Sequence, residues 1–415
     1  MALSSAPKMT TMPDYRADFP VLQTQMNGKA LAFLDSGASA QKPQSVIDAM
    51  NAVLEGGYSN IHRGLYSISQ QLTADFEAVR AKTAGFIGAN SEKEIVFTRN
   101  STEAINLVAH SWARVNLRQG DEIILTQMEH HANIVPWQLL AEQIGVEIKV
   151  IPVLDDGTLD YDAFEALLSE KTKLVGVVHI SNATGIINNI NKIINVSRNF
   201  NPKIKVLIDG SQGAVHTPVN VKELDADFYV FTGHKLYGPT GIGVLFGKYD
   251  VLKAMPPFMG GGDMIERVSF EGTEYREAPY RFEAGTPPIV EVIGLGAAID
   301  YVENVGFDYI EAHENALRDY GHQRLKEIDG LKLYGTHPDK IGIFSFTIDG
   351  LHHSDIGMIL DQCGIAVRAG HHCCMPLMQR YGIEGTIRAS LGLYSNEHDI
   401  DQLIDGLKKA RDMLG

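Results

Sequence analysis

Apolar segments of strand length alternate with helix-like segments between about residues 81 and 251 of the chain. Parallel strands need a long crossover between them, and that crossover is usually a helix. The alternation therefore predicts an α/β fold with a mostly parallel sheet covered by helices. The strand-like runs lie at 94–98, 122–126, 173–180, 205–209 and 228–233.

A different pattern begins near Phe307, where longer helices and a few strands follow one another. A chain of 415 residues is too long for one compact core, so we expect two domains. We assign residues 30–295 to a large domain, and residues 1–29 together with 296–415 to a smaller α+β domain. The boundary is soft, because 289–302 has the pattern of a helix that can bridge both domains.

Charge and cysteine content narrow the class of protein. A formal charge of −15, with the acids scattered along the chain, makes nucleic acid an unfavourable partner. Three cysteines in a chain of this length cannot form a disulfide framework. The segment 1–15 lacks the apolar core of a signal peptide, and no apolar run approaches the ~18 residues that span a bilayer. We expect a cytoplasmic protein with reduced thiols and no membrane partner.

Polar groups follow each of the five strand-like runs, in "RNSTEAIN", "EHHAN", "SNATG", "DGSQ" and "TGHKLYGPTG". In an open α/β sheet, ligands bind beyond the carboxyl ends of the strands. The segment from Asn100 to Glu103 resembles a capping box, and the helix N-terminus that it predicts attracts phosphate. Taken singly, Asp209 could cap a helix, Lys235 could lie on the surface and His130 could be structural. Five polar strand ends in one sheet favour a single anionic, ring-shaped ligand instead.

Pyridoxal phosphate matches this set of groups. Its phosphate needs a helix N-terminus and hydroxyl donors, its pyridine nitrogen a carboxylate, and its aldehyde a lysine. The lysine must lose its charge to react, which burial and a nearby cation assist. Nicotinamide cofactors fit poorly, since the glycines of "GPTGIGVLFG" follow the lysine and run into another apolar stretch. The sequence also contains no P-loop.

The segment "RAGHHCCMPL" (368–377) joins two histidines to two of the three cysteines. Zinc needs four ligands that converge on one point. Consecutive residues of an extended chain point to opposite sides, so we predict no metal site here. The remaining interpretations are two inert buried thiols, or a nucleophilic thiol beside His371, His372 and Arg368.

The sequence resembles the pyridoxal-phosphate-dependent cysteine desulfurases, within the class V aminotransferase-like group of fold-type I enzymes, and most of all their SufS-type subgroup. The resemblance rests on "LDSGASAQKP", "HRGLYSIS", "QMEHHANIVPW", "DGSQ", "TGHKLYGPTGIG", "RFEAGTP" and "RAGHHCCMPL", which run in the family's order from residue 34 to about 395. It implies a mostly parallel seven-stranded sheet with helices on both faces, a smaller α+β domain that carries the catalytic-cysteine loop, and a homodimer.

The resemblance also implies which residues surround the ring of pyridoxal 5′-phosphate. Lys235 would attach the cofactor covalently and act as the catalytic base. Asp209 would pair with the pyridine nitrogen, and His130 would stack on the ring face. Gln212 and Asn182 would lie near the phenolic oxygen.

Other residues would hold the phosphate and the substrate. The phosphate ligands would be Thr102, Thr232, His234 and, from a second subunit, Thr286. Arg388 would bind the substrate carboxylate, a role that suits a planar bidentate donor. Further substrate-binding residues would be Asn182, His62, Arg63 and Arg368.

The implied reaction converts L-cysteine to L-alanine and leaves the sulfur as a persulfide on Cys373. The cofactor would act as an electron sink, and a thiolate would attack the substrate sulfur before passing it on. The expected partner is a SufE-like or SufU-like sulfur acceptor, or a scaffold complex, in iron–sulfur cluster assembly. Selenocysteine could enter the same pocket, because a selenol leaves more easily than a thiol.

Cys374 departs from the family pattern, in which we expect a small residue without a thiol. It could be a secondary sulfur acceptor or half of a strained disulfide, but we favour a bystander. Cys363 is expected to be a packed hydrophobic residue. The competing functions are an aminotransferase, which needs no thiol, a selenocysteine lyase, and a catalytically idle scaffold, which would not need Lys235, Asp209 and Cys373 together.

Overall fold

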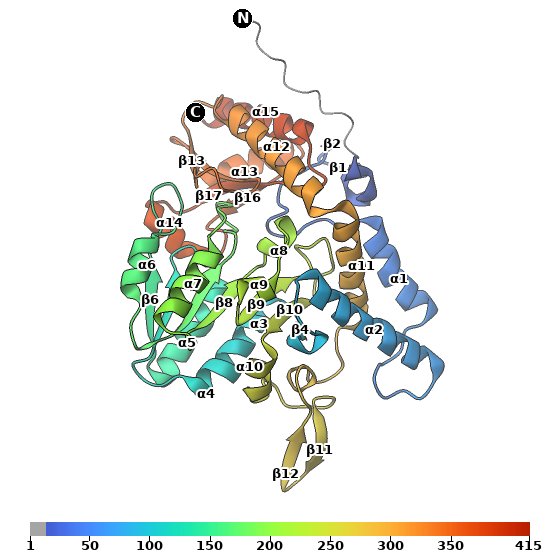
Figure 1. The fold of residues 1–415 in the computed structure, drawn as a ribbon. Coiled ribbons are helices and arrows are strands. Elements are labelled where there is room, and N and C mark those ends of the chain that lie inside the picture. The colour runs from blue at the N-terminus through green and yellow to red at the C-terminus, as the bar shows by residue number, and fades with distance from the viewer. Residues whose placement is uncertain (1–13) are drawn as a thin grey trace, which may run out of the picture.

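A seven-stranded sheet of order β4-β10-β9-β8-β7-β5-β6 forms the centre of the protein, in a computed structural model that describes residues 14–415 (Figure 1). Within this sheet only β10 runs antiparallel to its neighbours. The expected mostly parallel seven-stranded sheet is therefore confirmed. Its strands are β4 (Ile95–Thr98), β5 (Glu122–Thr126), β6 (Glu147–Ile151), β7 (Thr172–Val178), β8 (Lys205–Asp209), β9 (Phe228–Thr232) and β10 (Gly243–Gly247).

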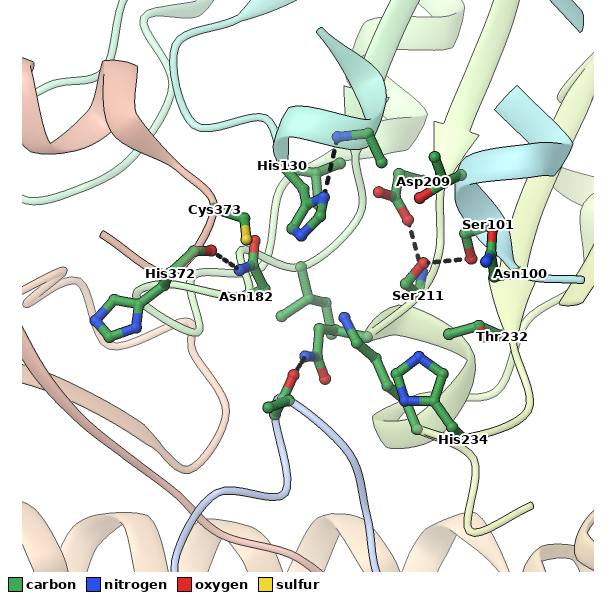
Figure 2. Close-up of a pocket in the computed structure, with 18 of the residues that line it drawn as sticks. Asn100, Ser101, His130, Asn182, Asp209, Ser211, Thr232, His234, His372 and Cys373 are labelled. Carbon is green, nitrogen blue, oxygen red and sulfur yellow. Dashed lines mark hydrogen bonds between the residues drawn. The ribbon is translucent and has the colours of Figure 1, made fainter. Parts of the chain in front are cut away.

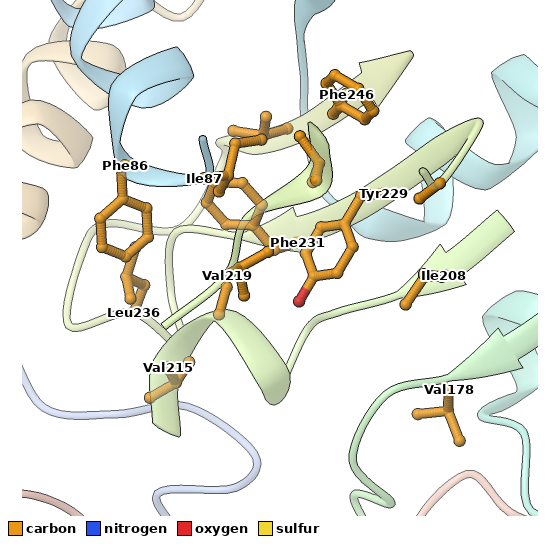
Figure 3. Close-up of a cluster of buried hydrophobic side chains, with 14 of the residues drawn as sticks. Phe86, Ile87, Val178, Ile208, Val215, Val219, Tyr229, Phe231, Leu236 and Phe246 are labelled. Carbon is orange, nitrogen blue, oxygen red and sulfur yellow. The ribbon is translucent and has the colours of Figure 1, made fainter. Parts of the chain in front are cut away.

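Helices cover both faces of this sheet, because successive strand residues point to opposite sides. Tyr229 and Phe231 of β9 lie in one buried cluster, whereas Phe228 and Val230 lie in another. The first cluster includes residues of α2 (Ser67–Phe86), α6 (Tyr161–Leu167), α7 (Ile190–Phe200), α8 (Gly213–His216), α9 (Val221–Leu224) and α11 (Ile289–Val305). The second includes residues of α3 (Ser101–Leu107), α5 (Val135–Ile144) and α10 (Tyr249–Ala254). Figure 3 shows part of the first cluster, around Phe231.

A second sheet of order β13-β14-β17-β16 is antiparallel and belongs to the C-terminal part of the chain. Its strands are β13 (Leu331–Tyr334), β14 (Ile343–Ile348), β16 (Arg368–Gly370) and β17 (Thr386–Ser390). Residues of β13, β14 and β17 share a third buried cluster with α12 (Phe307–Leu325), α13 (His353–Gln362) and α15 (Glu397–Leu414). The apolar stripe of α15 is buried in this cluster, as its pattern predicted.

Ala32 and Leu34, near the start of the described chain, belong to the cluster of α12, α13 and α15. Strand β3 (Ala32–Phe33) pairs in parallel with β15 (Ile365–Ala366), and Asp35 bridges to Ser390. The sequence pattern assigns residues 30–295 to the large domain. Residues 32–35, however, pair with β15 and with Ser390 and not with the large sheet. The domain division itself stays a prediction, and residues 1–13 of the small-domain assignment and of the signal-peptide expectation lie outside the described residues.

The remaining elements lie mainly around the large sheet. Helix α1 (Gln44–Gly56) packs on α11. A hairpin of β11 (Ile265–Ser269) and β12 (Gly272–Tyr275) projects from the body of the protein (Figure 1). The short helix α14 (Met375–Tyr381) follows the two adjacent cysteines. None of the helices within residues 14–415 is long and apolar enough to cross a membrane.

We predict that Phe231→Ala lowers the free energy of unfolding by about 3–5 kcal/mol, because it removes a large buried side chain and leaves a cavity. Phe200→Ala is the matched control, since Phe200 of α7 is 44% exposed, and it should cost far less. Urea unfolding of both variants without cofactor measures the difference. Equal losses would show that this cluster is not packed as described.

Candidate active site

A cavity of about 210 Å³ lies beyond the carboxyl ends of β7, β8 and β9. This is where ligands bind in open α/β sheets. Most of the residues expected at the site line it, as Figure 2 illustrates for several of them. Those residues are Thr102, His130, Asn182, Asp209, Gln212, Thr232, His234, Lys235, Arg368, Cys373 and Arg388.

Lys235 and Asp209 place opposite charges in the cavity. Asp209 is the last residue of β8 and is buried, and its Oδ1 accepts a hydrogen bond of 3.0 Å from the backbone N–H of Ser211. Burial lowers the pKa of Lys235, while the carboxylate of Asp209 opposes that shift. A lysine with a lowered pKa can more readily present a neutral amine. This is the state that a carbonyl group needs in order to react.

The hydroxyl groups of Ser101, Ser211 and Thr232 and the imidazole of His234 lie on the same side of the cavity as Asp209 (Figure 2). Asn100 caps α3, where its side chain accepts from the backbone N–H of Glu103 at 2.9 Å. The Ser101 and Ser211 hydroxyls are 2.8 Å apart. The pKa of His234 is lowered to about 4, first by burial, so the ring is neutral at pH 7.

The expected capping box is only half formed. Asn100 supplies its cap, but the carboxylate of Glu103 accepts from the N–H of Arg99 instead of returning to Asn100. The reciprocal bond is therefore displaced by one residue. The helix N-terminus that the motif predicted is present.

His130 lies over the cavity as a neutral ring. Burial first, and the positive charge of Lys235 second, lower its pKa to about 4. Its Nδ1 accepts a hydrogen bond of 3.0 Å from the N–H of Ala132, so its proton is on Nε2. A neutral imidazole with this orientation can stack on an aromatic ring.

The cysteine loop turns sharply at the mouth of the cavity. His372 and Cys373 both have positive φ, at 52° and 56°, which is uncommon for residues other than glycine. Three contacts hold this conformation: Asn182 Nδ2 donates to His372 O at 2.8 Å, His131 N to Cys373 O at 2.8 Å, and His372 Nε2 lies 2.8 Å from Thr386 Oγ1. Cys373 is exposed and also lines the cavity.

The premise that residues 371–374 form an extended chain is therefore wrong, because the loop contains left-handed residues. Within residues 14–415 no three His, Cys, Asp or Glu side chains come close enough to hold a metal ion.

The two adjacent cysteines differ in environment. Cys374 is fully buried, and burial raises the pKa of its thiol to about 12. Its Sγ lies 3.2 Å from Oδ1 of Asn182, to which the thiol can donate. A buried thiol that stays protonated is a poor nucleophile. Cys363 is partly buried against the cluster of α12, α13 and α15, as expected of a packed hydrophobic residue.

Arg388 is a buried guanidinium at the edge of the cavity. Its Nη1 donates to the carbonyl of Asn182 and its Nη2 to Asp35, both at 2.9 Å. Its Nε is buried without a hydrogen-bond partner among the described residues. Arg368 also binds Asp35, at 2.9 Å. Two guanidinium groups share one carboxylate, so one positive charge is left over, and together with the unused Nε of Arg388 this allows a carboxylate ligand to be held here.

Three expected residues lie away from this chain's cavity. His62 Nε2 is 3.1 Å from Glu77, and the exposed Arg63 reaches Asp263 at 3.3 Å. Thr286 is exposed, just before α11. Their assignment to the site stays a prediction.

Sequence reasoning did not select Asp35, Ser101 or Ser211 as site residues. Asp35 follows the apolar run 31–34, so the rule applied to the other strand ends would have found it. Ser101 and Ser211 were within the quoted strand-end segments, but neither motif distinguished them from their neighbours.

Comparison with known proteins identifies the family. The model of the Aminotransferase class-V family matches residues 32–403. A cysteine desulfurase of Dickeya dadantii (strain 3937) is 50% identical over 401 residues, which are 96% of this chain and 97% of the relative. The chain belongs to the cysteine desulfurases of the class-V aminotransferase family.

Solved structures agree with this membership. The cysteine desulfurase CsdA of Escherichia coli, in an S-sulfonic acid form, has a TM-score of 0.90 and 38% identity, and the match covers 98% of this chain and 100% of that chain. A C-DES mutant with glycine covalently linked to its PLP cofactor has a TM-score of 0.81 and 25% identity, over 95% of this chain and 99% of that chain. Members of the family depend on pyridoxal 5′-phosphate, and this is the cofactor of the chain.

The donor set of the cavity fits that cofactor. Pyridoxal phosphate requires a lysine for its aldehyde, a carboxylate for its pyridine nitrogen and hydroxyl donors for its phosphate. A lysine with a lowered pKa, a buried aspartate and the hydroxyl groups near the N-terminus of α3 are all present. A neutral imidazole is available for the ring face.

Acid should destabilise the protein by protonating the buried His179, which directly follows β7. His179 is hydrogen-bonded to Tyr229, and burial lowers its pKa to about 4 from its ordinary value of 6.5. Because the unfolded chain takes up this proton first, the stabilisation is complete above pH 6.5 and is lost as the pH falls toward 4. Between pH 7 and 5.5 the loss should be about 1 kcal/mol.

Urea unfolding of the cofactor-free protein at these two pH values measures the loss. His179→Asn should reduce the pH dependence by that amount, whereas His398→Asn, at an exposed position, should leave it unchanged. An unaltered pH dependence in His179→Asn would refute the buried neutral state.

Proposed function

We propose that the protein is a SufS-type cysteine desulfurase that converts L-cysteine to L-alanine and leaves the sulfur as a persulfide on Cys373. The observation that carries the proposal is the position of Cys373. Its thiol group is on an exposed turn, yet the residue lines the same cavity as Lys235 and Arg388. A thiol in this position can meet a substrate inside and an acceptor outside.

The cofactor would be held by residues from several elements. Lys235 would attach it, Asp209 would face the pyridine nitrogen, and His130 would cover the ring. The residues toward the phosphate would be Thr102, Thr232, His234 and the partner-derived Thr286. Gln212 and Asn182 would lie beside the phenolic oxygen.

The substrate would be bound through its carboxylate. Arg388 offers its unused Nε there, and Arg368 lies nearby through their shared partner Asp35. When bound, pyridoxal phosphate supplies an electron sink that weakens the bonds around the substrate's α-carbon. Lys235 can then accept or return a proton at its Nζ, because burial lowers its pKa.

The sulfur transfer balances without an external oxidant. The bond between the substrate's Cβ and its sulfur breaks, and a bond forms between that sulfur and Cys373 Sγ. The carbon gains a proton, so L-cysteine and an enzyme thiol become L-alanine and an enzyme persulfide. A thiol reductant or an acceptor cysteine then removes the outer sulfur.

Cys374 is assigned no part in this transfer. Burial raises the pKa of its thiol to about 12, so the thiol stays protonated and is a poor nucleophile. Its Sγ lies 3.2 Å from Asn182 Oδ1, to which the thiol can donate.

Alanine release from L-cysteine, with a thiol reductant present, tests the assignment. Cys373→Ser should lose activity by on the order of 100-fold or more, because a hydroxyl cannot replace the thiolate as the sulfur acceptor. Cys374→Ser should keep most of its activity, since serine can also donate to Asn182. Each variant must hold its yellow cofactor for the comparison to count. If only Cys374→Ser loses activity, the nucleophile is Cys374 and not Cys373. If both variants stay active, the enzyme releases sulfur without a protein thiol and is a lyase.

A homodimer is part of the proposal. The hairpin of β11 and β12 projects from the body and exposes Phe270 completely and Val268 by 64% (Figure 1). Leu65 is 92% exposed near His62 and Arg63. A second copy of the chain would cover such apolar residues. It would also bring His62, Arg63 and Thr286 to the partner's cavity, which explains why they lie away from their own.

Mixed dimers test this arrangement. Lys235→Ala and Thr286→Ala should each be impaired alone, whereas mixing and re-forming dimers should recover activity, because every mixed dimer then contains one complete cavity. Mixed dimers that form but show no recovery would place Thr286 outside the partner's site.

The proposed function also includes a cellular location, a sulfur acceptor and a second substrate. We propose that the protein is cytoplasmic and delivers sulfur to a SufE-like or SufU-like acceptor, or to a scaffold complex, for iron–sulfur cluster assembly. Selenocysteine is proposed as an additional substrate, because its weaker carbon–selenium bond suits the same chemistry.

A further inference from the structure

Gln212 lies between the cofactor cavity and a buried pair of titratable residues. It is the residue before α8, it lines the cavity, and it is 2% exposed. His216, at the end of α8, and Glu314 of α12 are also buried. His216 Nδ1 lies 2.9 and 2.8 Å from the two carboxylate oxygens of Glu314, and its Nε2 lies 3.3 Å from Gln212 Oε1. A continuous chain of contacts therefore runs from the small-domain helix to the cavity.

The orientation of the Gln212 amide is fixed by its other neighbour. Gln212 Nε2 donates to the carbonyl oxygen of Gly37 at 2.8 Å. If the amide were turned over, two oxygens would face each other at that distance, which is unfavourable. Oε1 must therefore point to His216. Since this oxygen is only an acceptor, the Nε2 of His216 must carry a hydrogen and donate it.

One hydrogen of the Gln212 amide remains available for a further hydrogen bond. The NH₂ group has two hydrogens, and one is bonded to Gly37. No acceptor within residues 14–415 is hydrogen-bonded to the other, and Gln212 lines the cavity. The amide can thus present a fixed donor to a ligand there.

We propose that His216 and Glu314 are positioning residues, which hold the Gln212 amide so that its free N–H faces the cofactor. This inference rests on the proposed function, in which the acceptor is the phenolic oxygen of pyridoxal phosphate. The carboxyl group of Glu314 fixes His216 through Nδ1, at 2.9 and 2.8 Å, and this keeps the Nε2–H of His216 on Gln212. The pair also connects α12 of the small domain to the site.

Two substitutions of His216 separate this role from a purely structural one. The amide of a glutamine reaches the position of Nε2, so His216→Gln can still donate to Gln212 but loses Glu314. An asparagine amide reaches the position of Nδ1, so His216→Asn keeps the bond to Glu314 and loses Gln212. The dissociation constant for pyridoxal 5′-phosphate, its visible absorption when bound, and the melting temperature of the cofactor-free protein are measured for both.

We expect His216→Asn to bind the cofactor roughly tenfold more weakly, the effect of one lost hydrogen bond, and to shift its absorption. His216→Gln should bind as the wild type does, although it should melt at a lower temperature because Glu314 is left buried without a donor. In a Gln212→Ala background, His216→Asn should have no further effect on binding, since it acts through that amide. Glu311→Gln, one turn earlier in α12 and without a hydrogen bond or ion pair to His216 among the described residues, should match the wild type.

The reverse order, with His216→Gln weak and His216→Asn normal in binding, would overturn the proposal and leave a structural link between α8 and α12. An undiminished effect of His216→Asn in the Gln212→Ala background would overturn it as well. A wild-type protein that binds no cofactor would contradict the proposed function itself.

Discussion

The parallel alignment of β7, β8 and β9 is the constraint on which the rest of the site depends. Val178, Asp209 and Val230 are neighbours in register, so the chain leaves all three strands at one edge of the sheet. The residues that follow must therefore converge there. Asp209 at the end of β8 and Lys235 shortly after β9 therefore line one cavity, although they are not neighbours in the sequence.

The second sheet contributes further residues to the cavity. It supplies Arg388 from β17 and Cys373 from the loop after β16. Hydrogen bonds from His131 and Asn182 hold that loop against the strand ends of the large sheet. The site therefore combines a rigid set of cofactor groups with a thiol that is held by a few contacts at the surface. Burial in the cavity lowers the pKa values of Lys235 and His130, and raises the pKa of the neighbouring Cys374.

Much of this architecture could be predicted from the sequence because strongly apolar strands carry a local signal. The runs that became β5, β8 and β9 are fully or almost fully buried, so their composition is unambiguous. Strand β6 was not predicted, because it is an edge strand with exposed Glu147 and Val150 and a weak pattern. Asp35 was missed because the strand-end rule was applied only to the runs of the large sheet, whereas Asp35 follows the run 31–34, whose short strand β3 lies in another sheet.

Other features have no local signal at all. The left-handed turn at His372 and Cys373 is imposed by contacts with Asn182, His131 and Thr386, all distant in sequence or on other elements. The pair of His216 and Glu314 joins residues 98 positions apart, and only the packing of α8 on α12 brings them together. Such contacts depend on long-range packing, and no sequence motif predicts them.

In the proposed reaction Cys373, and no other thiol, receives the sulfur. Mass spectrometry after a single turnover with L-cysteine, without reductant and with free thiols alkylated, tests it most directly. We expect one additional sulfur atom on Cys373, with Cys374 and Cys363 unmodified. An additional sulfur atom on Cys374, or on neither cysteine while alanine has been formed, would contradict it.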